Sequence, residues 1–217
     1  MTVTTAAPTL TLIAAIAASN RGIGSRGKLP WKLPGDLAYF NGVTSQAPPN
    51  HLNACILGRV TWDFIPKRFR PLDNRYNIVI SSNPDLLADE QPPHTVVLPS
   101  VAQALEHVAQ INASNDSALK IHRVFICGGH GIYKEALEMT ETHPVQILLT
   151  EVQLADASAC DAFFPEFDRD RFVRQPHARL EQVAARKVAS GTQSENGIDY
   201  EFVLYEPSTA TASLEQQ

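Results

Sequence analysis

The chain has 217 residues, 44% of them hydrophobic, and a formal charge of −5. This length and apolar content are sufficient for one sizeable core within a single α/β domain. The mildly acidic balance argues against non-specific nucleic-acid binding, and the chain contains no basic run.

The cysteine pattern favours a reducing compartment. Cys55, Cys127 and Cys160 are far apart in the chain and odd in number, so they form neither a metal-binding spacing nor a disulfide framework. We therefore expect a cytoplasmic protein without a metal site. Each cysteine is predicted to be a small buried hydrophobic residue rather than a nucleophile.

Hydrophobic runs and their breaks predict the elements in chain order. Residues 1–8 and 207–217 are expected to be flexible tails around a single domain at 9–206. The apolar run at 10–18 follows no basic residue and is too short to span a bilayer, so it is predicted to be a buried strand rather than a signal or membrane segment. Strands are predicted at 9–17, 53–57, 76–80, 95–98, 123–127 and 145–152, followed by antiparallel closing strands at 172–174, 183–190 and 200–205. Helices are predicted at about 33–44, 59–66, 101–111 and 131–139.

This alternation of strands and helices predicts a three-layer α/β sandwich. Its central sheet is expected to be mixed but mostly parallel, with about eight strands and with helices on both faces. The continuous apolar character of the first strands is typical of strands that are covered on both faces.

Asp36 stands out within the first predicted helix. Leu33, Leu37 and Phe40 follow helical spacing and are expected to share one apolar face, with Asp36 at its edge. A carboxylate buried there requires a charged or hydrogen-bonding partner, which a ligand can supply. The alternative is a first-turn acid that faces water and is favoured by the helix dipole. Spacing alone leaves both interpretations open.

The glycines Gly22, Gly24 and Gly27 match the spacing of the dinucleotide-binding fingerprint G-x-G-x-x-G. That fingerprint requires a helix to begin at the third glycine. Here Pro30 follows closely, and a residue before proline is pushed out of helical conformation. We therefore reject this interpretation and predict that the glycines are hinges of a mobile loop.

Two strand-to-helix junctions suggest a phosphate-bearing ligand. One predicted strand ends at Gly58 and another at Gly128-Gly129, and each runs into a helix. Glycine permits close approach of the backbone, and a helix N-terminus presents free N–H groups to an anion. Arg59 and the pair Ser81-Ser82 would suit one further phosphate through charge-assisted hydrogen bonds. The alternative is that the glycines only form tight turns and that Arg59 is a solvated residue.

Four further side chains could have either a structural or a functional role. His130 has no acid or nucleophile at the spacing of a triad, so it is predicted to be a surface or capping residue. Trp31 and Trp62 are expected in the core. Arg75 could bind a carboxylate through its forked guanidinium or could be a surface charge, and its spacing does not decide between the two.

Taken together, these segments resemble the dihydrofolate reductase family, and the match extends over residues 10–205. The segments that carry the resemblance are 29–40 (LPWKLPGDLAYF), 58–66 (GRVTWDFIP), 69–72 (FRPL) with Arg75, 125–133 (FICGGHGIY) and 149–151 (LTE). Their order and spacing agree with the family. The resemblance implies a dihydrofolate reductase-like fold and the reduction of 7,8-dihydrofolate to tetrahydrofolate by NADPH. It also implies a monomer that binds antifolates such as methotrexate, but no nucleic acid and no membrane.

The resemblance also assigns roles to residues. It places Asp36 at the family's acid position, with Thr150 orienting the carboxylate, Trp31 holding a nearby water, and Leu29 in the loop that closes over the nicotinamide. The residues that it places around the substrate are Ile13, Ala15, Asp36, Leu37, Phe40, Ile65, Leu72, Arg75, Cys127 and Thr150. Those that it places around NADPH are Ala15, Ile23, Gly24, Gly27, Lys28, Gly58, Arg59, Val60, Thr61, Ser81, Ser82, Cys127, Gly128, Gly129, His130, Gly131, Ile132 and Tyr133.

Three positions depart from the family pattern. Val60 replaces a basic or imidazole residue, Pro99 stands where an arginine often contacts adenosine, and Cys127 replaces isoleucine or valine. A preference for NADPH over NADH would therefore depend on Arg59 and the two serines. Two rival functions remain: a reductase of the riboflavin pathway, which predicts no acid at Asp36, and a non-catalytic binding module for folate or NADPH.

Overall fold

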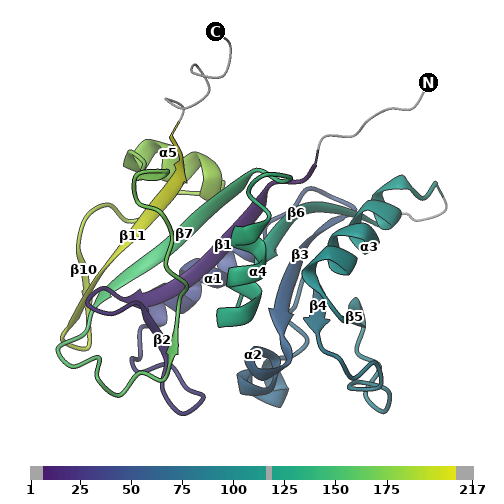
Figure 1. Ribbon diagram of the computed structural model, residues 1–217, viewed down its shortest axis with the longest axis horizontal. Helices are drawn as coiled ribbons and strands as arrows, with labels where there is room; N and C mark the ends of the chain where they lie inside the picture. Colours follow the sequence, from purple (N-terminus) through teal and green to yellow (C-terminus); the bar gives the residue numbers. More distant parts are fainter. Residues whose placement is uncertain (1–6, 116–118, 209–217) are drawn as a thin grey trace, which may run out of the picture.

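A computed structural model describes residues 7–115 and 119–208, in which helices cover both faces of one main sheet (Figure 1). The strands of this sheet lie in the order β10-β11-β7-β1-β6-β3-β4-β5, and β9 pairs with the end of β11. Their bounds are β1 Leu10–Ala17, β3 His51–Gly58, β4 Arg75–Ile80, β5 Thr95–Leu98, β6 Lys120–Ile126, β7 Val145–Gln153, β9 Phe172–Arg174, β10 Gln193–Glu195 and β11 Ile198–Pro207. The pairings from β7 through β5 are parallel, and those of β9, β10 and β11 are antiparallel. The predicted mixed, mostly parallel sheet is therefore confirmed.

The helices divide the apolar residues into two large clusters, one on each face of the sheet. Their bounds are α1 Pro34–Ser45, α2 Arg59–Phe64, η1 Lys67–Phe69, α3 Val101–Ala113, α4 His130–Glu138 and α5 His177–Ala184. Buried residues of α3 and α4 belong to one cluster, and those of α1 and α5 belong to the other. Alternate residues of β1 enter the two clusters, so this strand is apolar along almost its whole length, and its single polar residue, Thr11, is buried.

The glycine-rich segment after β1 contains a short strand. β2, Gly22–Gly24, pairs with β8, Ala162–Phe163, so the segment predicted to be only a mobile loop begins with paired backbone. Gly27 has a φ of +74°, and a Cβ there would lie 2.0 Å from a ring carbon of Phe64. Positive φ and close packing both favour glycine at this position. Between residue 7 and Pro34 no helix begins, which agrees with the rejection of the dinucleotide fingerprint.

The strand predicted at 183–190 is wrong. Residues 177–184 form α5 instead, whose Leu180, Val183 and Ala184 are buried on one side. Ala185 adopts the left-handed conformation and ends the helix. A short apolar run by itself does not distinguish a helix from a strand. Pro207, which was expected to begin the C-terminal tail, still belongs to β11 and pairs with Phe172. Most residues of the two predicted tails, 1–6 and 209–217, lie outside the described part of the chain.

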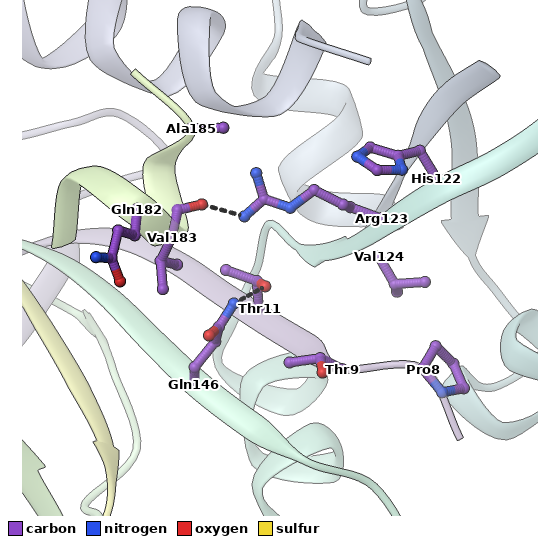
Figure 2. Close-up of a pocket in the computed structure, with 10 residues that line it drawn as sticks. All are labelled: Pro8, Thr9, Thr11, His122, Arg123, Val124, Gln146, Gln182, Val183 and Ala185. Carbon is purple, nitrogen blue, oxygen red and sulfur yellow. Dashed lines mark hydrogen bonds between the residues drawn. The ribbon is translucent and has the colours of Figure 1, made fainter. Parts of the chain in front are cut away.

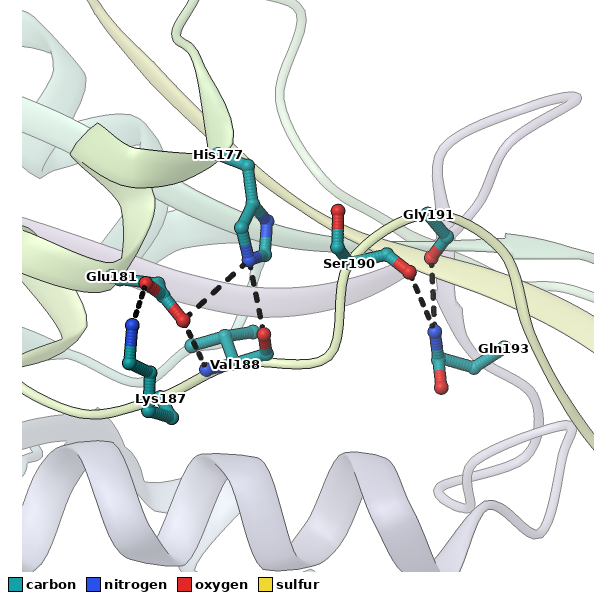
Figure 3. Close-up of polar contacts among 7 residues, drawn as sticks. All are labelled: His177, Glu181, Lys187, Val188, Ser190, Gly191 and Gln193. Atoms are coloured by element: carbon teal, nitrogen blue, oxygen red, sulfur yellow. Dashed lines mark hydrogen bonds and ion pairs between the residues drawn. The ribbon is translucent and has the colours of Figure 1, made fainter.

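Polar contacts hold the connection between α5 and β10 (Figure 3). The Val188 N–H donates to Glu181 at 3.2 Å, and the Val188 carbonyl lies 3.0 Å from Nε2 of His177. Glu181 also accepts from Lys187 at 2.9 Å. Gln193 donates to two backbone carbonyls just before β10. These contacts fix the path of the chain into the hairpin of β10 and β11, which reaches the site described below.

No helix in residues 7–115 and 119–208 is long and apolar enough to cross a membrane.

Candidate active site

Asp36 lies in the first turn of α1 and is buried, with 8% of its surface exposed. Burial raises the pKa of its carboxyl to about 6, the hydrogen-bonding hydroxyl of Thr150 lowers it, and the negative charge of Glu195 raises it. Thr150 belongs to β7 and pairs with Ala15, two residues before the end of β1. The interpretation of Asp36 as a solvent-facing first-turn acid is therefore wrong. A carboxyl with this pKa exchanges a proton readily near neutral pH.

The buried face of α1 differs from the predicted one. Leu33 is buried but precedes the helix, Leu37 is 55% exposed, and Phe40 is half-buried. The inward residues of the helix are Asp36, Tyr39, Val43 and Thr44. Because the helix begins at Pro34, its inward stripe passes through Asp36 rather than beside it.

The apolar residues predicted around the substrate are mostly brought together. One cluster contains Ile13, Trp31 and Leu72, with Ala15, Phe40, Ile65 and Cys127 packed against it. Leu37 is outside this cluster. The exposed apolar side chains Leu29 and Leu37 follow the end of β1, and Val60, Phe64 and Phe69 follow the end of β3. Apolar surface thus remains open at the carboxyl edge of the parallel strands, where α/β sheets bind ligands.

Trp31 is buried as predicted, with 7% of its surface exposed. Its indole Nε1 finds no hydrogen-bond partner among the described residues. A buried N–H without a partner costs free energy unless water or a ligand accepts its hydrogen bond. This donor therefore marks a position for a small polar group.

Arg75, at the start of β4, is buried rather than a surface charge, with 6% of its surface exposed. Its Nε donates to the carbonyl of Asp73 at 2.9 Å, and its Nη1 donates to Asn41 at 3.1 Å and to Thr44 at 2.9 Å. Its guanidinium carbon lies 5.9 Å from the ring centre of Phe40. Within residues 7–115 and 119–208, Arg75 forms no salt bridge, so its charge is held in place without a protein carboxylate.

The two predicted strand-to-helix junctions lie side by side. The N–H of Gly58 donates to the carbonyl of Gly128 at 2.7 Å. A Cβ on Gly129 would lie 3.3 Å from the Thr61 hydroxyl, and one on Gly58 would lie 3.2 Å from Ile132. α2 starts after the first junction and α4 after the second. Helix N-termini and tight backbone approach therefore meet at one place on the sheet edge, as an extended phosphate ligand requires.

Arg59 and Ser81 occupy matching positions next to these junctions. Gly58 and Ile80 are paired at the ends of the neighbouring strands β3 and β4. Arg59 and Ser81 are the next residue after each of them. Arg59 is half-exposed and forms a 3.0 Å salt bridge with Asp63 on the next turn. The Ser81 hydroxyl accepts from the N–H of Asn83 at 3.1 Å.

Several predicted cofactor residues have contacts within the protein. The Tyr133 hydroxyl is buried and donates to the carbonyl of Ile13 at 2.8 Å, which ties α4 to β1. His130 is exposed, as expected, and its Nδ1 lies 2.8 Å from the carbonyl of Phe163. Lys28 and Ser25 exchange backbone hydrogen bonds in the turn after β2. Ile23 and Gly24 are in β2 itself. Ser82 lies two residues after the end of β4, and Gly131 is the second residue of α4.

The cysteines agree with the prediction that they are packing residues. Burial raises the pKa of the Cys127 thiol, and the thiol of Cys55 beside it raises that pKa further. Burial also raises the pKa of Cys160. Because the thiolate is the nucleophilic form, these thiols are poor nucleophiles. No group of His, Cys, Asp and Glu in residues 7–115 and 119–208 is arranged to hold a metal ion.

Sequence analysis missed Glu195 and Tyr200, which lie on the hairpin of β10 and β11. The N–H of Gly35 donates to both carboxylate oxygens of Glu195, at 3.0 and 3.1 Å, and Tyr200 donates to the same carboxylate at 2.8 Å. The dipeptide Asn196-Gly197 is the usual signal of a two-residue hairpin turn and could have placed Glu195 at its edge.

A separate cavity of about 430 Å³ opens elsewhere, near the amino ends of β1 and β7 (Figure 2). Thr9, Thr11, Arg123 and Gln146 contribute to its lining. Arg123 donates to the carbonyl of Val183 at 2.6 Å, and Gln146 donates to Thr11 at 2.7 Å. Because Asp36 and Thr150 lie toward the carboxyl ends of these strands, the cavity does not belong to the candidate active site.

Comparisons with known proteins agree on one family. A family model described as "Dihydrofolate reductase" matches residues 9–206. The dihydrofolate reductase of Schistosoma mansoni is 35% identical over 197 residues, covering 91% of this chain and 95% of that protein. The dihydrofolate reductase of Heliothis virescens is 36% identical over 199 residues, covering 90% and 96% respectively. A solved structure of Schistosoma mansoni dihydrofolate reductase superposes with a TM-score of 0.74 at 32% identity, covering 93% of this chain and 99% of that one.

The raised pKa of Asp36 predicts that Asp36→Asn stabilises the protein at pH 8 but not at pH 4. Folding raises this pKa from 3.8 to about 6, so the native state binds more protons between these values and loses stability as the pH rises through 6. Asparagine has no such dependence. The difference in unfolding free energy between wild type and Asp36→Asn should therefore change by about 2.5 kcal/mol between pH 4 and pH 8.

Urea denaturation over a pH series measures this difference. Asp199→Asn, which removes an exposed carboxylate from β11, is the matched control. Parallel stability curves for wild type and Asp36→Asn would contradict the assigned burial of the charge.

Proposed function

Because the chain belongs to the dihydrofolate reductase family, we propose that it reduces 7,8-dihydrofolate to 5,6,7,8-tetrahydrofolate with NADPH. The observation that carries this proposal is the buried Asp36 carboxyl, whose pKa is raised to about 6 and which has the Thr150 hydroxyl beside it. A neutral ligand without complementary donors does not recover the cost of burying this carboxylate. A pterin offers an amino group and a ring N–H side by side, which suit a carboxylate that accepts two hydrogen bonds.

Asp36 would have two roles in this reaction. As a carboxylate it binds the 2-amino group and N3 of the pterin, and near its pKa it favours protonation at N5. Thr150 orients the carboxylate from β7. The free indole N–H of Trp31 would hold a water near the carboxylate. Leu29, which is exposed in the loop before α1, would help exclude bulk water when ligands bind.

The rest of the substrate would lie along the open apolar edge. Ile13, Ala15, Leu37, Phe40, Ile65, Leu72 and Cys127 supply apolar and backbone contacts to the pterin and benzoyl groups. Arg75 is held by Asp73, Asn41 and Thr44 without an ion pair in the described residues, which favours binding of the substrate's α-carboxylate.

The paired junctions fit NADPH. Gly58, Gly128 and Gly129 would permit close approach of the pyrophosphate to the N-termini of α2 and α4, and Arg59 with Ser81 would bind the 2′-phosphate. When bound, NADPH supplies the hydride for the pterin. The other proposed cofactor contacts are Ala15, Ile23, Gly24, Gly27, Lys28, Val60, Thr61, Ser82, Cys127, His130, Gly131, Ile132 and Tyr133. Since the Tyr133 hydroxyl already donates to Ile13, its ring rather than its hydroxyl would make the contact.

We further propose that residues 9–206 act as a single monomeric domain in the cytoplasm, that methotrexate-type antifolates bind at Asp36, and that nucleic acid is not a partner. The riboflavin-pathway reductase is not favoured, because it requires no acid where Asp36 is buried.

Purified protein should oxidise NADPH when dihydrofolate is added, and methotrexate should inhibit this turnover. Asp36→Asn should retain NADPH binding but lose at least ~100-fold in turnover at neutral pH, because acid assistance contributes this order of rate. Near-normal turnover of the variant would contradict the role of Asp36. NADPH binding without any reduction of dihydrofolate would favour a non-catalytic binding module instead.

Arg75→Met should weaken dihydrofolate far more than a dihydropterin that lacks the glutamate tail. Loss of a charge-assisted pair costs about 1.5–3 kcal/mol, which corresponds to a KM increase of roughly 10- to 100-fold. Arg68→Met, which removes an exposed arginine from η1, is the matched control. Equal losses for the two substrates would assign Arg75 a structural role only.

Arg59→Ala should weaken NADPH by about tenfold or more and leave NADH almost unchanged, because only NADPH carries the 2′-phosphate. Dissociation constants from the quenching of protein fluorescence provide the measurement. A similar loss for both cofactors would reject the 2′-phosphate contact.

A further inference from the structure

The N-terminus of α1 is capped by a residue far away in the chain. Leu33, at the N-cap, offers no side-chain hydrogen bond, and Pro34 has no N–H. The first free donor is the N–H of Gly35, and it donates to both oxygens of Glu195, 160 positions later. Glu195 therefore does for this helix what a serine or aspartate N-cap normally does.

Glycine at position 35 is required by this cap. A Cβ on Gly35 would lie 2.1 Å from Oε1 of Glu195 and 2.5 Å from the hydroxyl of Tyr200. Real Cβ atoms do not approach other atoms so closely, so any larger residue would displace the carboxylate.

The hairpin holds Glu195 in place. The buried Tyr200 donates its hydroxyl to Oε1 at 2.8 Å, and in the turn Asn196 donates to the carbonyl of Lys32 at 2.8 Å. The hairpin thus contacts the chain on both sides of Pro34, at Lys32 before α1 and at Gly35 in its first turn. The Glu195 charge consequently has a defined position beside the first turn of α1.

Asp36 is the next residue after Gly35, and several elements face its carboxyl. These groups are Thr150 from β7, Glu195 from β10, Tyr200 from β11, Tyr133 from α4 and Tyr39 from α1. Burial raises the pKa of all three tyrosines, so they remain neutral hydroxyls near neutral pH. The positive charges of Arg123 and Arg186 act on Tyr39 in the opposite direction and lower its pKa. Among these described groups facing Asp36, Glu195 supplies the negative charge.

We propose that Glu195 is a positioning residue for the reductase reaction: it caps α1 at Gly35 and sets a fixed negative charge beside Asp36, which favours the protonated form of that carboxyl. This inference rests on the proposed function, in which the proton of Asp36 assists the reduction of dihydrofolate. Two like charges at short range disfavour the ionisation of one of them, and burial enlarges the effect.

Glu195→Gln tests the charge apart from the cap. Glutamine keeps a carbonyl acceptor for the Gly35 N–H but loses the charge. We expect the pH profile of kcat/KM for dihydrofolate to shift to lower pH by about half a unit, with a roughly threefold loss on its alkaline side. The KM for NADPH should not change.

A ¹³C NMR titration of the aspartate carboxyls reports Asp36 without any turnover, and Asp36→Asn assigns the signal. Asp36 should titrate at lower pH in Glu195→Gln than in wild type. Glu201→Gln, which removes a carboxylate of β11 that pairs with Arg174, is the matched control. This control should not shift the Asp36 titration.

Gly35→Ala provides a second variant that keeps every charge. It should displace Glu195 and lower the Asp36 titration point as well, so the proposal stays testable if Glu195→Gln does not fold.

An unchanged Asp36 titration in Glu195→Gln, or an equal shift in Glu201→Gln, overturns the proposal. If Glu195→Gln shifts the Asp36 titration but the wild-type protein does not reduce dihydrofolate, the placement of the charge is supported and the proposed function is refuted. The two failures are therefore distinguishable.

Discussion

Burial of the Asp36 carboxylate places demands on three separate elements of the fold. Removing such a charge from water costs several kcal/mol unless hydrogen bonds or a proton compensate it. β7 supplies the Thr150 hydroxyl, while β10 supplies a second carboxylate that opposes ionisation. α1 begins at Pro34, which turns its inward stripe through Asp36. Because the compensation inside the protein is partial, Asp36 keeps binding capacity for a ligand that brings donors.

Because its strands are parallel, one edge of the sheet presents two chemically different surfaces. Carboxyl ends of parallel strands meet at one edge, and each is followed by a helix or loop. The ends of β3 and β6 join through Gly58 and Gly128, and this half offers helix N-termini. The end of β1 leads to Trp31 and Asp36, and this half offers apolar surface with one acid. An anionic cofactor and a flat polar ring can therefore bind side by side without covalent chemistry from the protein.

The sequence predicted the elements whose signal is local. Strands such as 95–98 and 172–174 were placed correctly because their turns and apolar runs lie within a few residues. The strand predicted at 183–190 failed, because a short apolar run fits either a helix or a strand and only packing on β11 selects the helix.

Orientation within the site could not be derived from local signals. Spacing left Arg75 undecided, since its partners Asn41 and Thr44 come from a helix more than 30 positions earlier. Asp36 was equally undecided, because the inward face of α1 depends on where the helix begins. Glu195 was missed altogether, since its role exists only through Gly35, 160 positions away. The resemblance to a family supplied the ligand assignments that these residues alone left open.

The hairpin of β10 and β11 has a consequence for the order in which the chain acquires activity during synthesis. Translation proceeds from the N-terminus, so Asp36 is made well before Glu195, which caps its helix, and before β11, which pairs with Thr150 through Phe202. A nascent chain that lacks residues 193–207 has neither the capped helix nor the covered edge of β7. The helix cap and the cover on β7 are therefore completed together, only once residues 193–207 have been made.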